Sequence, residues 1–91
     1  MARKRLSDYH WRQDEVNGHW LLRINDAYSF IVAPVQGKTE EFMYSVHDEY
    51  LGFHGKEMHD CCCECAKWKC VGFLERGEWA KLAPGAGSNE P

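Results

Sequence analysis

The chain has no long hydrophobic run. Its most apolar stretch covers about residues 28–35, whereas a membrane-spanning helix needs roughly 20 consecutive apolar residues. The basic start, from Met1 to Arg5, is followed by polar Ser7 and Asp8, so the apolar segment of a signal peptide is missing as well. We therefore expect no membrane association and a cytoplasmic protein, in which thiols stay reduced.

The number of cysteines is odd. The chain has five, so a complete set of intramolecular disulfides is excluded. With 91 residues, of which 44% are hydrophobic and 27% charged, the composition is that of one small globular domain and not of a disordered chain. We expect this domain to cover residues 1–82, followed by a flexible tail over residues 83–91, which are rich in glycine, proline and serine.

No strong excess of charge of one sign is present, since the net charge is −3. The charges are nevertheless distributed unevenly. Residues 1–12 hold four basic and one acidic side chain, a net charge of +3, and residues 38–64 hold two basic and seven acidic side chains, a net charge of −5. A domain that binds nucleic acid usually presents a basic face. A short basic arm before an acidic middle favours a protein partner with a basic surface instead.

The first half of the chain has the pattern of β-structure. Asn17-Gly18 is a strong turn signal between two strand-like segments, residues 9–12 and 19–24. Aromatic and β-branched residues predict a central strand over residues 28–33, and alternation predicts another over residues 42–46. Residues 50–53 are a candidate return strand. Together these segments predict an antiparallel meander of four to five short strands.

The pattern changes after Gly55. Met58, Cys61, Cys65 and Trp68 recur at spacings of three and four, which places them on one face of a helix. We expect this helix to cover about residues 57–72, to end at a glycine, and to pack its cysteine face on the sheet. The predicted fold class is therefore α+β, with one helix on a meander.

Five cysteines lie close together between Cys61 and Cys70, and Cys62 and Cys65 form a C-x-x-C pair. Thiolate and imidazole are the ligands that zinc prefers, and a structural zinc site needs four of them. The candidate ligands for one zinc ion are His59, Cys62, Cys65 and Cys70, with His54 or Cys61 as substitutes. Four side chains on one regular helix cannot surround an ion, so ligands from elsewhere, such as His10, His19 or His47, would then be needed.

Two other interpretations of the cysteines stay open. Buried free cysteine behaves as a small hydrophobic residue, so the cysteines of the helix would be core residues. A C-x-x-C pair near a helix start has a lowered thiol pKa, which suits a redox function, and adjacent thiols also bind soft ions such as Cu(I).

No catalytic pattern is recognisable from spacing, there is no internal repeat, and no motif resembles a family specifically enough to name it. We therefore expect a protein that is not an enzyme. The candidate partner-binding residues are the acidic pairs and one tryptophan near the tail expected to be exposed: Glu40, Glu41, Asp48, Glu49 and Trp79.

The predicted function is that of a small, non-catalytic, intracellular module that binds another protein. An inhibitor that covers the surface of its target, of the kind carried by phages and other mobile elements, would have this size and charge. One alternative is a zinc-stabilised nucleic-acid-binding protein that uses Arg3, Lys4 and Arg5. The other is a thiol protein that senses redox state or soft metal ions.

Overall fold

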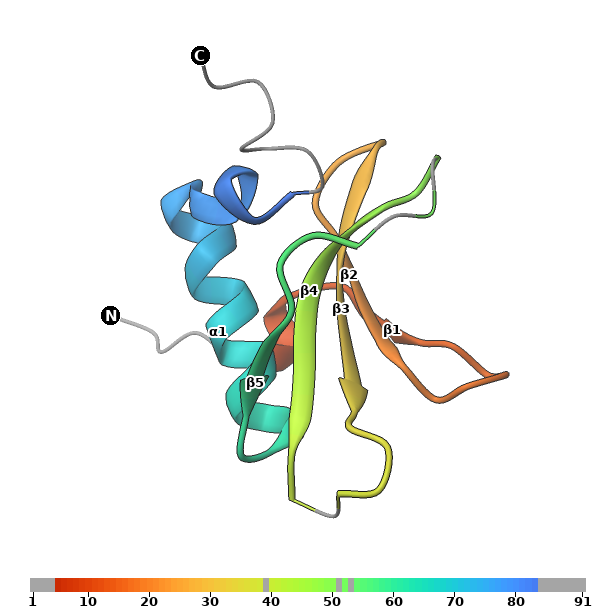
Figure 1. The fold of residues 1–91 in the computed structure, drawn as a ribbon. Coiled ribbons are helices and arrows are strands. Elements are labelled where there is room, and N and C mark those ends of the chain that lie inside the picture. Colours follow the sequence, from red (N-terminus) through yellow and green to blue (C-terminus); the bar gives the residue numbers. More distant parts are fainter. Residues whose placement is uncertain (1–4, 39, 51, 53, 84–91) are drawn as a thin grey trace.

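The computed structural model describes residues 5–38, 40–50, 52 and 54–83. Figure 1 shows two layers, a five-stranded antiparallel sheet and a helix that packs against one face of it. The predicted α+β fold is thus confirmed, with the strands in meander order. No helix among the described residues is long and apolar enough to cross a membrane.

The strands follow one another in the sheet in the order β1-β2-β3-β4-β5, and each pairs with the next in antiparallel fashion. The central pair, β3 and β4, is the longest. The elements are β1 (Trp11–Gln13), β2 (Trp20–Arg23), β3 (Tyr28–Pro34), β4 (Phe42–Asp48), β5 (Met58–Asp60), the helix α1 (Cys63–Arg76), and two short 3₁₀ helices, η1 (Leu6–Asp8) and η2 (Glu78–Leu82).

Asparagine side chains stabilise the first two turns of the meander. Gly18 adopts a φ of 76°, a conformation that costs glycine little, and the side chain of Asn17 accepts a hydrogen bond from the amide of His19. At the next turn, the side chain of Asn25 accepts hydrogen bonds from the amides of Ala27 and Tyr28. The turn at Asn17-Gly18 lies where the sequence predicts it.

The core lies between α1 and one face of the sheet. Phe30 and Val32 on β3, and Val46 on β4, are completely buried on this face. The helix contributes Ala66, Cys70 and Val71. Burial of each large apolar side chain contributes about 1.5–3 kcal/mol to folding, so this contact is the main source of stability in the domain.

The predicted start of the helix is wrong. Met58 to Asp60 extend the sheet as β5, paired with the first residues of β4, and α1 begins only at Cys63. Met58 and Cys61 therefore precede the helix, and Trp68 is 38% exposed, so the predicted buried face is also wrong. The helix ends at Gly77, in the left-handed conformation, whose amide donates to the carbonyl groups of Phe73 and Leu74.

The predicted return strand and the predicted tail lie partly outside the described residues. Tyr50 lies in a turn, and the strand that returns beside β4 is β5, at residues 58–60. Leu51 and Phe53 of the predicted return strand lie outside the described residues. Residues 84–91 lie outside them as well. The flexible tail and the domain boundary therefore stay predictions.

The connection between β4 and β5 packs closely on η2. A Cβ atom added to Gly55 would lie 1.7 Å from the backbone oxygen of Leu82 in η2. Gly72, within α1, has room instead, because its added Cβ atom would meet only the flexible end of the Arg76 side chain, at 3.0 Å. Gly55 is therefore required for the close backbone contact, whereas a small side chain fits at Gly72.

We predict that Gly55→Ala lowers the free energy of unfolding by about 2 kcal/mol, because backbone atoms have to move apart. Gly72→Ala, its matched control, should raise it by about 0.5–1 kcal/mol, because alanine favours the helix. Urea denaturation followed by circular dichroism measures both. A Gly55→Ala variant as stable as the parent would contradict the close packing of the loop on η2.

Candidate metal centre

Three thiols converge where β5 ends and α1 begins. The sulfur atoms of Cys61, Cys62 and Cys65 all lie within 4.8 Å of one another, and those of Cys61 and Cys65 are 3.8 Å apart. Cys61 and Cys62 belong to the bend that leads into the helix, whereas Cys65 lies in its first turn. The bend therefore brings together side chains that one regular helix would spread around its axis.

Cys62 caps the start of α1. Its backbone is extended, with φ −155° and ψ 164°, and its sulfur accepts a hydrogen bond from the amide of Cys65, with 3.2 Å between the two atoms. Hydrogen bonds from the thiol and the amide of Cys65 lower the pKa of the Cys62 thiol, and the amide of Glu64 contributes further. The positive end of the helix dipole favours the same thiolate form.

The thiol of Cys65, in contrast, keeps its proton. Its hydrogen bonds with the sulfur atoms of Cys62 and Cys61 raise the pKa of the Cys65 thiol to about 12. Cys62 is thus the preferred thiolate of the cluster, and Cys65 shares its proton with it. A bound cation would displace this proton, because a metal takes the deprotonated thiolate as its ligand.

The spacing of the sulfur atoms suits a metal ion. Tetrahedral zinc with Zn–S bonds of about 2.3 Å places its sulfur ligands about 3.8 Å apart, and the sulfur atoms of Cys61 and Cys65 are separated by 3.8 Å. The cluster therefore has the geometry to hold a metal ion.

The other predicted ligands do not join this cluster. Cys70 is completely buried in the core, and burial raises the pKa of its thiol. The two ring nitrogens of His59 lie 2.5 Å from a carboxylate oxygen of Glu41 and 2.9 Å from one of Glu57, and these contacts raise the pKa of His59. His54 lies beside His47 on the face of the sheet opposite α1.

The five cysteines thus have two different environments. Cys70 is a core residue, and Cys63 is half-buried and packs against the core, which raises the pKa of its thiol. Cys61 is exposed, and Cys62 and Cys65 are half-buried. Of the predicted zinc ligands and their substitutes, the structure brings together Cys61, Cys62 and Cys65.

The predicted partner-binding residues do not form one surface. Glu40 and Glu41 precede β4, whereas Asp48 and Glu49 lie at its other end. Asp48 is 8% exposed and accepts a hydrogen bond from the amide of Tyr50. The carboxylate of Glu49 accepts one from the Ser29 hydroxyl, with 2.6 Å between the oxygen atoms.

Trp79 differs from the exposed anchor that the sequence suggested. It is half-buried, it packs against the core, and its ring centroid lies 5.7 Å from that of Tyr28. The cause is η2, which follows Gly77 directly and returns the chain to the end of the sheet, where its residues contact β4.

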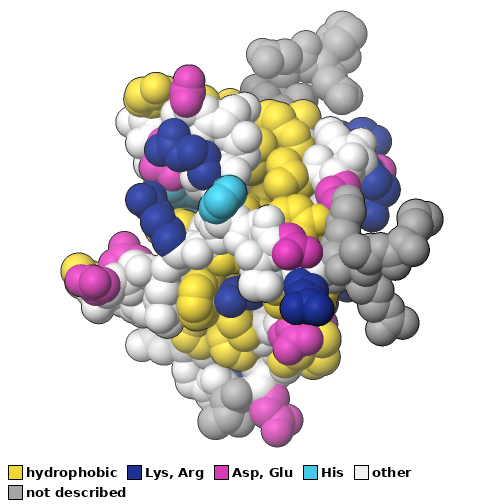
Figure 2. Space-filling view, turned by 180° about the vertical axis from the view of Figure 1, so that it is seen from behind, with side chains coloured by type: hydrophobic (Ala, Val, Ile, Leu, Met, Phe, Trp, Pro, Cys, Tyr) yellow, Lys and Arg dark blue, Asp and Glu magenta, His cyan; other side chains and the backbone are white. Residues whose placement is uncertain are grey.

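Charges of both signs mix on the surface. Figure 2 shows acidic and basic side chains interspersed on the face that it views, around hydrophobic side chains that reach the surface. Arg5 is exposed, and Arg3 and Lys4 lie outside the described residues. No continuous basic surface of the kind that binds nucleic acid is visible on the described residues of this face.

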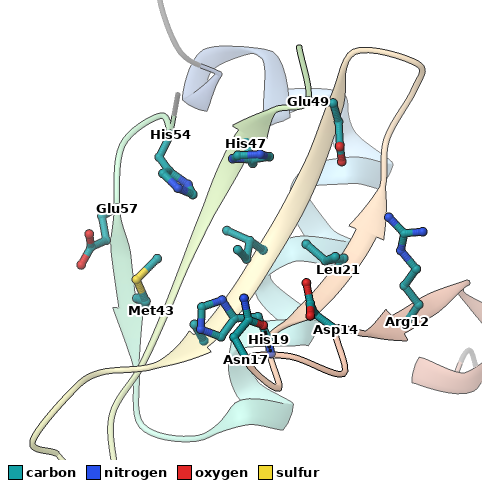
Figure 3. A pocket seen from close by; sticks show the side chains of 12 residues that line it. Arg12, Asp14, Asn17, His19, Leu21, Met43, His47, Glu49, His54 and Glu57 are labelled. Atoms are coloured by element: carbon teal, nitrogen blue, oxygen red, sulfur yellow. Dashed lines mark hydrogen bonds between the residues drawn. The ribbon is translucent and has the colours of Figure 1, made fainter. Parts of the chain in front are cut away.

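A second feature was missed in the sequence. The face of the sheet opposite α1 is hollowed, and the residues around the hollow, among them Asp14, His19, His47 and His54, come from separate segments (Figure 3). The alternation of side chains along β2, β3 and β4 was the available signal, because it places Leu21, Ile31 and Met43 on the face that does not contact the helix.

We predict that Cys62→Ser leaves the helix start intact in metal-free protein, because the serine hydroxyl accepts the same amide hydrogen bond. Cys62→Ala should lower the free energy of unfolding by about 1 kcal/mol, because the cap is lost. Urea denaturation with a chelator present measures both values. Equal losses for the two variants would show that Cys62 does not cap α1.

We also predict an order of reactivity among the thiols. In metal-free, reduced protein at pH 7, iodoacetamide should modify Cys62 first, because its lowered pKa gives it the largest thiolate fraction. Cys70 should react only on unfolding, because it is completely buried. Peptide mapping by mass spectrometry after short exposures gives the order, and reaction of Cys70 as early as Cys62 would contradict it.

Comparison of the chain with protein-family models, with curated proteins and with solved structures finds no match. The cluster at the start of α1 is therefore interpreted from its own geometry and chemistry.

Proposed function

We propose that this protein is a thiolate metal-binding domain that holds one zinc ion through Cys61, Cys62 and Cys65. The observation that supports it is the convergence of the three sulfur atoms within 4.8 Å. Soft thiolate ligands favour zinc and Cu(I) over hard ions such as magnesium and calcium. Zinc additionally accepts a fourth ligand, which the surroundings of the cluster can supply.

An acidic depression adjoins one residue of the cluster, Cys61. A hollow of about 420 Å³ next to the cluster is lined by Glu40, Glu41, His59, Asp60 and Cys61. Water, a carboxylate or a group from another molecule would be available here as a fourth ligand. Three protein ligands with one open position are typical of zinc sites that bind an external ligand, whereas purely structural sites have four protein ligands.

Metal binding should not be required for folding. The packed contact between α1 and the sheet uses Ala66, Cys70 and Val71, and none of the three cluster thiols belongs to it. The ion would instead join the bend after β5 to the first turn of the helix. We therefore expect the metal-free domain to be folded and the bound ion to add stability.

We predict that titration with Co²⁺, a spectroscopic substitute for zinc, produces thiolate charge-transfer and tetrahedral absorption bands that saturate at one ion per chain. Cys61→Ser, Cys62→Ser and Cys65→Ser should each weaken binding at least about tenfold, because each removes a ligand. Zinc should displace the cobalt and abolish the bands.

The matched control is Cys63→Ser, which removes a neighbouring thiol that does not belong to the cluster. It should leave the stoichiometry and the spectrum unchanged. Equal weakening by Cys63→Ser and Cys65→Ser would refute the assigned site, and so would failure to bind any of cobalt, zinc and Cu(I). If the protein takes up Cu(I) but neither cobalt nor zinc, the three thiols are still the binding site, and the proposed ion changes from zinc to Cu(I).

Binding of a basic protein partner is the second candidate function. The feature that favours it is the face of the sheet opposite α1, where carboxylates and half-buried apolar side chains line one hollow. The redox alternative uses the same Cys62 and Cys65 thiols as the metal site, so the reactivity measurement above bears on it too.

A further inference from the structure

One face of the sheet is covered by no helix of the described residues. Helix α1 packs on the face that carries Phe30 and Val32, and Figure 3 shows the opposite face in front, with the helix behind the strands. There the strands form the floor of a hollow of about 710 Å³. This volume is within the range of small-molecule binding sites. Its apolar lining consists of Leu21, Ile31, Ala33 and Met43.

On this face of the sheet, two buried polar atoms have no hydrogen-bond partner among the described residues. Ser45 alternates with Met43 and His47 on β4, so its side chain is on the same face. It is completely buried, and its hydroxyl has no hydrogen-bond partner among the described residues. Nδ1 of His47 is also buried and has no hydrogen-bond partner among the described residues. Such groups are rare in native proteins because they destabilise the fold, so this face is not optimised for stability alone.

The charge of the lining is negative. The lining contains three carboxylates, those of Asp14, Glu49 and Glu57, and one cation, Arg12. Its net charge is therefore −2 when the histidines are neutral. The pKa of His54 is below its ordinary value, chiefly because of burial and then because of His47, so its ring is neutral at pH 7. An anion is therefore disfavoured at this site.

Two of the carboxylates are directed toward the hollow, as Figure 3 shows for Asp14 and Glu49. Each uses one oxygen within the protein: Oδ1 of Asp14 accepts the amide of Val16, and Oε1 of Glu49 accepts the hydroxyl of Ser29. Those two bonds fix the side chains in place. Among the described residues, no hydrogen bond uses the second oxygen of either carboxylate, which leaves it as an acceptor for a ligand.

We propose that this hollow binds an organic cation, an ammonium or guanidinium group on a hydrocarbon chain. The chain would lie on Leu21, Ile31 and Met43, and the cationic end would pair with the carboxylate of Asp14 or Glu49. Apolar burial supplies affinity and the carboxylates supply orientation. The site is on the other face of the sheet from the core, and it uses none of the three cluster thiols.

This inference deepens the second candidate function, because lysine and arginine side chains of a partner protein carry this chemistry. A free aliphatic amine carries the same chemistry. The experiment therefore includes both sources, so that failure of the protein partner is distinguished from failure of the site.

Three probes of equal chain length separate charge from apolarity: hexylammonium, 1-hexanol and hexanoate. We expect hexylammonium to shift the amide signals of Leu21, Ile31 and Met43 in ¹H–¹⁵N correlation spectra of the full chain. It should bind about threefold to fivefold more tightly than hexanol, the upper part of the range for exposed ion pairs, and hexanoate should bind more weakly still. Equal affinity for all three probes, or shifts confined to other regions, would overturn the proposal.

Matched variants test the named carboxylates. Asp14→Asn and Glu49→Gln should each reduce the affinity for hexylammonium by about threefold and leave that for hexanol unchanged. The control Glu15→Gln removes the same charge from an exposed neighbour that does not line the hollow. If Glu15→Gln weakens binding as much as Asp14→Asn, net charge alone attracts the cation and the assigned site is wrong.

A last pair of probes separates the sources. N-acetyl-lysine methylamide presents the amine on a peptide backbone, whereas hexylammonium presents it free. Equal binding of the two supports a partner's lysine as the occupant. Binding of hexylammonium alone retains the cation site as one for free amines and refutes recognition of a protein side chain. If neither probe binds, the site itself is refuted.

Discussion

The packing of α1 on the central strands is the contact on which the rest of the structure depends. Ala66, Cys70 and Val71 lie against side chains of β3 and β4 that are completely buried. In a domain of this size, one such contact has to offset most of the conformational entropy lost on folding. It also determines the orientation of the helix, so it decides which cysteines enter the core and which remain near the surface.

The start of the helix follows from the sheet next to it. Because Met58 to Asp60 pair with β4, the chain has to turn sharply before it enters α1. The residues of that turn are Cys61 and Cys62, and Cys62 satisfies an amide of the first helical turn. The thiol cluster is thus a product of the junction between strand and helix, and its lowered and raised pKa values arise from the hydrogen bonds of that junction.

The two faces of the sheet have different properties. The helix face is apolar and closely packed. On the other face, the buried hydroxyl of Ser45 has no hydrogen-bond partner among the described residues, and carboxylates line a hollow together with half-buried aliphatic side chains. A sheet selected only for stability would have paired or removed the buried hydroxyl. Proteins often accept such local costs where a surface has another role, which is why the uncovered face supports a proposal separate from the thiol cluster.

The local signals in the sequence determined the fold class. Asn17-Gly18 and Asn25 specify turns through their own backbone and side-chain preferences, and the aromatic and β-branched run over residues 28–33 specifies the central strand. The thiol segment was also visible, because C-x-x-C is a local pattern. These features depend on neighbours in the chain, so no tertiary contact is needed to recognise them.

Only the tertiary structure decided where the helix begins, which thiols converge and which carboxylates share a hollow. Met58 has helical spacing to Cys61 and Cys65, yet its hydrogen-bonded pairing with Tyr44 makes it part of a strand. That pairing puts Cys61 beside Cys65 and leaves Cys70 to the core. Likewise, Asp14 and Glu49 face one hollow because β1 and β4 belong to the same sheet. Periodicity along the chain contains no information on such long-range pairings, because they arise from hydrogen bonds and packing between distant segments.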